Sequence, residues 1–194
     1  MKKSLLSLLV LSLAGCANNP YLQPLPNVEN ARLRVVSIPS NNVFVSEPKR
    51  TECISEEWVN PISTLGFKVN LTRSLSRIGM PAQDKNIINA QQNEVYIPAG
   101  KDFTMKFSGV GLGSFGPGQS RSEGGINYNF CEKLITFNAK ANTDYEAVYD
   151  FVKVPDQGET CVVKLYQIVP QQDQSYQKVL VPDYKVIDQY CPSK

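Results

Sequence analysis

Histidine is absent from this chain of 194 residues. Without an imidazole, neither a Ser-His-Asp arrangement nor a histidine-ligated metal is available. No two cysteines have the C-x-x-C spacing that thiol–disulfide oxidoreductases use. A Ser-Lys pair or two carboxylates would still permit hydrolysis, but no motif marks either one. The sequence therefore favours a protein that is not an enzyme, with no cofactor and no metal.

Long hydrophobic runs are also lacking. The longest, Leu5 to Leu13, is about half of the roughly 20 residues that a membrane-spanning helix requires. Lys2 and Lys3 precede it and small residues follow it, which is the layout of an export signal. Removal of residues 1–15 leaves 18 Lys and Arg against 18 Asp and Glu. Because nucleic-acid binding needs a clustered excess of positive charge, this neutral domain is not expected to bind nucleic acid.

Cys16 stands directly after the small residues of this signal. It could be an unmodified cysteine in an ordinary secretory signal, but the stretch Leu13–Cys16 (LAGC) resembles, position by position, the lipobox of bacterial lipoproteins. The resemblance implies that residues 1–15 are removed and that Cys16 is lipidated, and two or three acyl chains anchor a protein stably. Inner-membrane lipoproteins of this class carry Asp where Ala17 stands. The resemblance thus implies an outer-membrane anchor and a domain that faces the periplasm.

Four further cysteines lie in the exported part of the chain. An even number of cysteines in an oxidising compartment predicts two disulfides. A zinc site is a poor alternative, because no two of these cysteines lie within a few residues of each other. Three pairings are possible, and we favour the nested one, which joins Cys131 to Cys161 and Cys53 to Cys191.

From Ala31 onward, apolar and polar residues alternate with a period of two. Residues 31–37 place Leu33 and Val35 on one face and arginines on the other, and residues 102–109 and 144–152 alternate in the same way. About eight or nine such strands, separated by Gly, Pro, Asn and Asp clusters, predict an all-β fold. We expect an antiparallel β-sandwich, either immunoglobulin-like or transthyretin-like.

These observations divide the chain into three parts. Residues 1–15 form the signal peptide, residues 16–30 a proline-rich tether with little that could pack, and residues 31–194 a single β-sandwich domain. Within the domain, residues 56–85 are the least regular and predict a short helix or a long excursion.

A glycine-rich stretch from Gly109 to Gly125 is the first candidate binding element. Its segment Gly111–Gly116 spells G-x-G-x-x-G, but Pro117 follows and no amphipathic helix is indicated, so no nucleotide site is expected. Long loops in compact domains are often binding elements or disordered, and this one could be a solvated flexible loop. In the binding interpretation, Phe115 and Arg121 would anchor a partner.

The excursion from Trp58 to Met80 is the second candidate. Its apolar residues, among them Phe67, Leu75 and Ile78, could pack in the core or form an exposed patch for a partner. The sequence thus favours a membrane-anchored module that binds or scaffolds an envelope protein. A small-ligand carrier would require a cavity between the sheets, and an envelope hydrolase would require a buried acid pair in a cleft.

The segment Ser74–Pro81 (SLSRIGMP), together with Cys131, residues 142–151 and Cys161, resembles a group of small uncharacterised bacterial envelope lipoproteins. This resemblance implies a β-sandwich and no particular activity.

Overall fold

The computed structural model describes residues 21–24, 29–38, 42–65, 76–81, 91–112, 120–123, 126–155 and 158–192. Within these ranges the chain forms strands and contains no helix. The strands are β1 (Asn30–Ser37), β2 (Asn42–Pro48), β3 (Trp58–Leu65), β4 (Gln91–Pro98), β5 (Asp102–Leu112), β6 (Ser120–Glu123), β7 (Ile126–Asn138), β8 (Asp144–Val154), β9 (Gly158–Pro170), β10 (Tyr176–Leu180) and β11 (Lys185–Ile187). They exceed the eight or nine predicted, because elements as short as β6 and β11 show no clear alternation.

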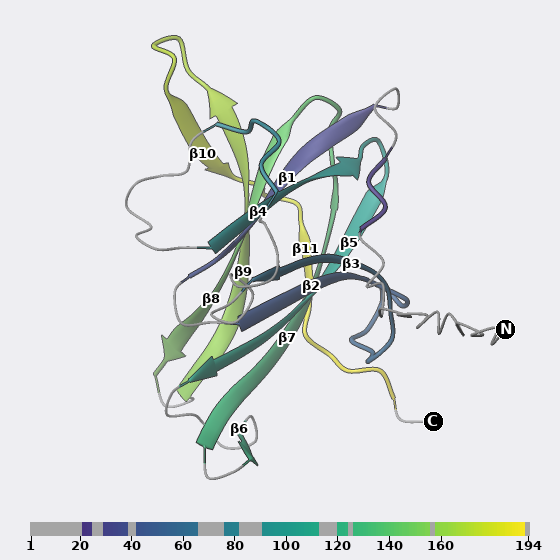
Figure 1. Cartoon of the computed structure of the whole chain (residues 1–194), viewed down its shortest axis with the longest axis vertical. Coiled ribbons are helices and arrows are strands. Elements are labelled where there is room, and N and C mark those ends of the chain that lie inside the picture. The colour runs from purple at the N-terminus through teal and green to yellow at the C-terminus, as the bar shows by residue number, and fades with distance from the viewer. Residues whose placement is uncertain are drawn as a thin grey trace, which may run out of the picture.

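Two sheets pack face to face, which confirms the predicted all-β sandwich (Figure 1). Sheet A has the order β10-β9-β8-β1-β4, and sheet B has the order β11-β7-β5-β2-β3, with β6 paired to β7. The prediction of an antiparallel sandwich needs one correction, because β1 runs parallel to β8. The other strand pairs are antiparallel.

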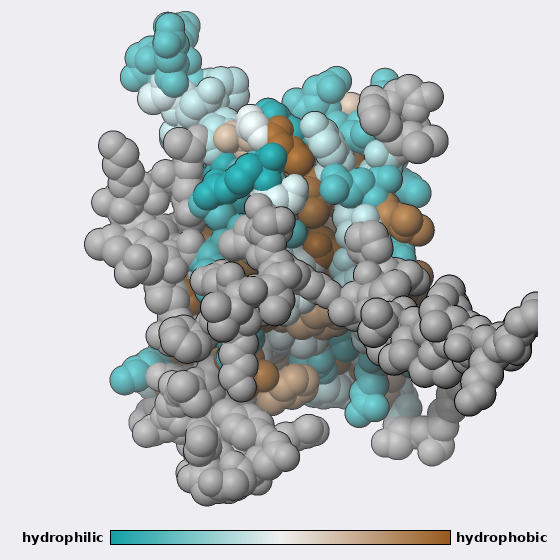
Figure 2. Space-filling view, in the orientation of Figure 1, coloured by the Kyte–Doolittle hydropathy of each residue, from teal (hydrophilic) through white to brown (hydrophobic). Residues whose placement is uncertain are grey.

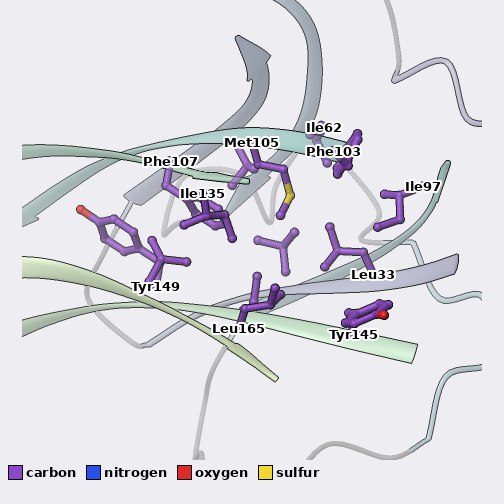
Figure 3. Close-up of a cluster of buried hydrophobic side chains, with 14 of the residues drawn as sticks. Leu33, Ile62, Ile97, Phe103, Met105, Phe107, Ile135, Tyr145, Tyr149 and Leu165 are labelled. Carbon is purple, nitrogen blue, oxygen red and sulfur yellow. The ribbon is translucent and has the colours of Figure 1, made fainter. Parts of the chain in front are cut away.

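The core lies between the sheets and is built from the alternate residues that the period of two identified. Leu33 from sheet A and Met105 and Phe107 from sheet B are 0% exposed and belong to one buried cluster. Figure 3 shows these side chains pointing toward one another from the two layers of strands. Burial of each side chain of this size stabilises the fold by about 1.5–3 kcal/mol.

One disulfide, Cys131–Cys161, crosses this core and joins β7 of sheet B to β9 of sheet A. The Tyr149 hydroxyl donates a hydrogen bond to the Cys131 carbonyl at 3.1 Å, and its ring stacks on Phe107. Gly109 of β5 makes room for this ring, because a Cβ at that position would lie 2.1 Å from the tyrosine oxygen. A glycine is therefore required there by close approach.

The two ends of the sandwich differ in the turns and chain segments that lie there. The β4–β5 and β7–β8 turns lie together at one end, because the Gly100 amide donates to the Ala139 carbonyl at 2.8 Å. Tyr21 packs against the core, and Gln23 accepts a hydrogen bond from the Tyr96 amide near the same end of β4. We call this end the Tyr21 end. We call the opposite end, where β5 finishes and β7 begins, the β6 end (bottom of Figure 1).

The packing of Tyr21 differs from the expectation for residues 16–30. That segment was expected to contain little that could pack, whereas Tyr21 packs against the core. Burial, and then the charge of Glu47, raises the pKa of the Tyr21 hydroxyl. The first part of the chain that the structure describes thus belongs to the sandwich.

The β9–β10 hairpin projects beyond the sandwich at the Tyr21 end (upper left of Figure 1). Its tip, residues 171–175, is closed by a hydrogen bond from the Gln171 amide to the Ser175 carbonyl at 2.8 Å. The tip is polar and exposed, and it forms the teal projection in Figure 2.

Both expected loops need correction. Gly109–Leu112 belongs to β5 and Ser120–Glu123 forms β6, so much of the glycine-rich stretch is strand and not loop. In the 56–85 region, Trp58–Leu65 forms β3 and residues 76–81 have no regular secondary structure. The expected short helix or long excursion otherwise falls on residues 66–75 and 82–85, which lie outside the described residues.

Candidate functional site

The outer face of sheet B, which is turned away from the core, is crossed by two segments of chain. They are residues 49–57, which connect β2 to β3, and the C-terminal residues 188–192. The disulfide Cys53–Cys191 ties them together, and backbone hydrogen bonds of 2.8 and 2.9 Å join Ile54 to the C-terminal segment. We call the two linked segments the strap. With the core disulfide, this bond confirms the nested cysteine pairing.

A buried ion pair lies beneath the strap. Lys106 of β5 and Glu132 of β7 are 3.2 Å apart, and their side chains are only 5% and 7% exposed. Lys106 Nζ also donates to the Ser55 carbonyl at 2.8 Å, and the Ser108 hydroxyl donates to Glu132 at 2.6 Å. Because a buried charge is tolerated only when it is paired and hydrogen-bonded, this pair holds the strap against the sheet through Ser55.

An open groove of about 950 Å³ runs beside the strap. Four aromatic rings line it, namely Phe44, Trp58, Phe130 and Tyr190. Trp58 contacts Phe44 edge to face, with 5.5 Å between the ring centroids, and is still 49% exposed. A concave surface that combines exposed aromatic rings with a few polar groups is typical of binding sites.

Charged side chains of both signs lie at the mouth of the groove. Lys49 pairs with Glu57 and Arg50 pairs with Glu52, and all four side chains are at least 45% exposed. Exposed pairs of this kind contribute only about 0–1 kcal/mol. They can therefore exchange their partners for the charges of a bound molecule at little cost.

The outer face of sheet A is covered by residues 76–81, which we call the 76–81 cover. The Ser76 amide donates to Asn93 Oδ1 at 2.7 Å, and the Ser76 carbonyl accepts from the Glu94 amide at 2.9 Å. The Ile78 amide donates to the Glu94 carboxylate at 2.8 Å. The cover is therefore bonded to β4 through its backbone.

Beneath the cover lies a second network of buried charge. Arg34, Glu94 and Glu146 are 0–1% exposed. The guanidinium donates to Glu146 at 3.1 Å and to Glu94 at 3.0 Å, and it also donates to the Pro81 carbonyl of the cover. Lys178 Nζ of β10 lies 2.7 Å from the second oxygen of Glu146. Burial alone would raise the pKa of Glu94, but the Ile78 amide and Arg34 outweigh burial and lower that pKa.

A smaller hollow of about 580 Å³ borders the 76–81 cover at the Tyr21 end. Arg32 and Asp144 line it, and they bind each other through two hydrogen bonds of 2.6 and 2.7 Å. Because this charged pair is already joined by two bonds, the hollow is a weaker candidate site than the groove.

Of the residues predicted to bind a partner, Trp58 is the one whose side chain belongs to the described part of the chain. Trp58 lines the groove. Arg121 belongs to β6, but its side chain lies outside the described residues, as do Phe115 and the lipidation site Cys16. Of the predicted apolar patch, Met80 is buried and Ile78 is partly buried. Phe67 and Leu75 lie outside the described residues.

Sequence reasoning missed the residues that surround Trp58. Phe44, Phe130 and Tyr190 come from two strands and the C-terminal segment, and nothing in their local pattern links them. The alternation predicted for residues 102–109 puts Lys106 on the face opposite Met105 and Phe107, and the structure confirms this placement. The overlooked signal is the pair Cys53 and Cys191. Their disulfide holds the strap over the outer face of sheet B, where Lys106 lies.

In the described ranges, no group of three or more His, Cys, Asp or Glu side chains is arranged to hold a metal ion. The same part of the chain has no helix with the length and apolar character needed to cross a membrane.

The fold and the groove define a class of protein: an all-β, doubly disulfide-bonded sandwich with an aromatic surface groove. Comparison with family models, with curated proteins and with solved structures found no match to this chain. The candidate site is therefore defined by its own geometry.

Proposed function

We propose that this protein is a lipoprotein, anchored to the outer membrane through Cys16, whose sandwich acts in the periplasm as a protein-binding or scaffolding module. The lipobox resemblance at Leu13–Cys16 supports the anchor. The two disulfides support an oxidising compartment, in which such bonds form and persist.

The groove beside the strap is the observation that carries the binding proposal. Its aromatic rings offer apolar contact area, and its exposed ion pairs offer exchangeable charges. Aromatic residues dominate the energetics of protein interfaces. The disulfide of the strap fixes one wall in advance, which lowers the entropy cost of binding. We propose an envelope protein as partner, inserting apolar or aromatic side chains next to Trp58.

We further propose that the sandwich is transthyretin-like and not immunoglobulin-like. An immunoglobulin constant-type sandwich has the orders ABED and CFG, so its first two strands share a sheet. Here β1 and β2 belong to different sheets. With β6 set aside, the orders β4-β1-β8-β9 and β3-β2-β5-β7 correspond to the D-A-G-H and C-B-E-F orders of a transthyretin-like sandwich. That correspondence supports this type, with β10 and β11 as additions at the sheet edges.

The alternative functions have less support. A small-ligand carrier needs a cavity between the sheets, and the space between the described strands is filled by the buried core cluster. A carboxylate hydrolase needs an acid whose pKa is raised. The buried pair Glu94 and Glu146 binds Arg34 instead, and the pKa of Glu94 is lowered. Burial raises the pKa of Asp150, but Asp150 lines neither the groove nor the smaller hollow.

The anchor is tested by fractionation of cells that express the wild type or Cys16→Ala, with mass spectrometry of the amino-terminal peptide. We expect the wild type in the outer-membrane fraction with a diacylglycerol and an acyl group on Cys16, and the variant without either modification. A wild-type protein with an unmodified Cys16 would contradict the anchor.

The groove is tested by crosslinking in cells, followed by mass spectrometry of the captured proteins. We expect Trp58→Ala to reduce capture of a defined envelope protein by about tenfold or more, as for an interface hot spot. Tyr176→Ala is the matched control, because Tyr176 is a similarly exposed aromatic residue on β10, away from the groove. Equal loss in both variants, or loss in neither, would contradict the groove as the binding surface.

The connection between β5 and β6, which includes Phe115, stays a second proposed surface together with Arg121. β5 and β6 pair with opposite edges of β7, so a deletion that joined Leu112 directly to Ser120 would pull one of these strands away. The sharper change replaces residues 113–119 with a glycine–serine linker of the same length, which removes Phe115 and leaves both strands in place. Capture that survives this replacement and fails in Trp58→Ala would assign binding to the groove alone.

A further inference from the structure

The chain joins the sandwich only a few residues after the proposed lipid anchor. Tyr21 packs against the core near Glu47 of β2, and Gln23 accepts the Tyr96 amide of β4 at 3.0 Å. The core cluster that Tyr21 contacts is built from both sheets, and Tyr96 belongs to sheet A. The point at which the anchor leaves the sandwich is therefore fixed.

The length of the intervening chain sets how far this point can stand from the lipid. Cys16 and Tyr21 are five residues apart in the sequence, and an extended chain spans at most about 3.6 Å per residue, or about 18 Å in total. β7 alone has 13 residues, which at about 3.3 Å each extend over roughly 40 Å. The tether is thus much shorter than the sandwich, and the Tyr21 end is held near the bilayer.

Exposed apolar side chains gather at the same end. Leu22 is 76% exposed beside the docked Tyr21, and Val59 at the start of β3 is 57% exposed. Tyr96, whose amide binds Gln23, is 37% exposed. Val59 lines a small hollow together with Lys101 of the β4–β5 turn. Apolar side chains and a tyrosine in this setting suit the interface between water and lipid, where aromatic rings are enriched.

We propose that the Tyr21 end faces the phospholipid surface, with Leu22, Val59 and Tyr96 at the headgroups, and that the β6 end points away from the membrane. The polar tip of the β9–β10 hairpin, residues 171–175, projects at the same end and would lie among the polar headgroups. This inference rests on the proposed lipid at Cys16. In this orientation the groove, on the outer face of sheet B, opens sideways along the membrane. A partner would therefore bind beside the anchored domain and not on top of it.

The test uses the chain from residue 16 to 194 with its disulfides intact. Four of its five cysteines are paired, so Cys16 is the thiol that reacts with maleimide-bearing phosphatidylethanolamine. The vesicles contain phosphatidylethanolamine, phosphatidylglycerol and phosphatidylcholine with a nitroxide on its headgroup. In a Trp58→Phe background, one tryptophan is placed by Lys101→Trp at the Tyr21 end or by Lys153→Trp at the β6 end. Both lysines are exposed, which makes the two probes a matched pair.

We expect the nitroxide to quench most of the Lys101→Trp fluorescence and little of the Lys153→Trp fluorescence. Addition of Tyr21→Ala, which frees the tether, is expected to reduce that difference. Equal quenching of the two probes, or stronger quenching of Lys153→Trp, would overturn the proposed orientation. A second result would also overturn it. If the chain without lipid forms a dimer, and the double variant Leu22→Ser with Val59→Ser does not, the apolar end is a protein interface.

The chemical coupling separates this test from the test of the anchor. If cells do not lipidate Cys16, the anchored function fails, and the vesicle experiment still reports which end a lipid on Cys16 would hold at the membrane. If the two probes are quenched equally, the orientation fails, and lipidation in cells is unaffected.

Discussion

The outer faces of the two sheets are built alike, but the chain segments that cover them are attached in different ways. Each is covered by chain that lies over buried charge. On sheet A, the 76–81 cover is held by hydrogen bonds, because Glu94 and Arg34 bind its backbone directly. On sheet B, the strap is held by the Cys53–Cys191 disulfide as well as by the contact of Lys106 with Ser55.

This difference underlies the proposal that the sheet B face binds a partner and that the sheet A face acts in stability. On sheet A the buried carboxylates are used internally, and the cover depends on them. On sheet B the disulfide, the backbone bonds of Ile54 and the contact of Lys106 with Ser55 secure the strap. Trp58 can therefore stay half exposed in the groove, and the strap does not depend on it. The comparison suggests that changes on sheet A act on stability and changes beside the strap act on binding.

The largest expected effect follows from removing the central charge of sheet A. Arg34→Met should lower the free energy of unfolding by about 3–5 kcal/mol, because it leaves Glu94 and Glu146 buried without their shared cation. Arg50→Met is the control on sheet B, where the exposed pair with Glu52 should contribute less than about 1 kcal/mol. Urea unfolding measures both variants, and similar losses in the two would contradict the contrast between the faces.

The next effect concerns the strap. Cys53→Ser with Cys191→Ser should lower the free energy of unfolding by about 2–4 kcal/mol, the usual contribution of a disulfide. The Ile54 amide, which bonds to the Gln189 carbonyl, should also exchange with solvent faster. Hydrogen exchange followed by mass spectrometry measures this locally. Unchanged protection of Ile54 would mean that the strap is held without its disulfide.

Acid should weaken the attachment of the 76–81 cover to sheet A. The pKa of Glu94 is lowered in the folded state, so its contribution is present above the ordinary glutamate pKa of about 4.3 and is lost as the pH falls below that range. Unfolding free energies measured from about pH 7 down to about pH 3 should therefore fall more steeply for the wild type than for Glu94→Gln. If the unfolding free energies of the wild type and Glu94→Gln depend on pH in the same way, the ionised Glu94 carboxylate does not stabilise the fold through its partners.

The smallest effect on stability is expected at the groove. Trp58→Ala removes an edge-to-face contact with Phe44, and such contacts contribute about 0.5–1.5 kcal/mol. Trp58→Phe should restore most of that loss. If the free energy of unfolding, measured by heat or urea, falls by several kcal/mol in Trp58→Ala, Trp58 supports the strap. That result would contradict the proposed contrast between a stabilising face and a binding face.

Local sequence pattern was sufficient for the core. Leu33, Met105 and Tyr149 alternate with polar residues, and that period identified both the strands and their buried faces. The same pattern could not reveal that Arg34 and Glu146 are buried. Alternation says that a residue faces away from the core, but it does not say whether water or another segment of chain covers that side.

The groove was predicted only through Trp58. The strap depends on a bond between residues separated by 138 positions, and local periodicity carries no information about such a contact. The favoured cysteine pairing contained that information, but the pairing alone does not say which face the strap crosses. Gly109 was assigned to a loop because glycine is frequent there, whereas the close approach of Tyr149 is a tertiary reason for a glycine in a strand.

The most direct test of the central claim places a photo-crosslinking amino acid at Trp58 on sheet B or at Tyr166 on the outer face of sheet A in living cells. Tyr166 pairs in register with Glu146, so the two positions report on opposite outer faces. We predict a covalent adduct with one defined envelope protein from Trp58 and none from Tyr166. Adducts from Tyr166 alone, or the same adducts from both positions, would contradict the groove as the binding face.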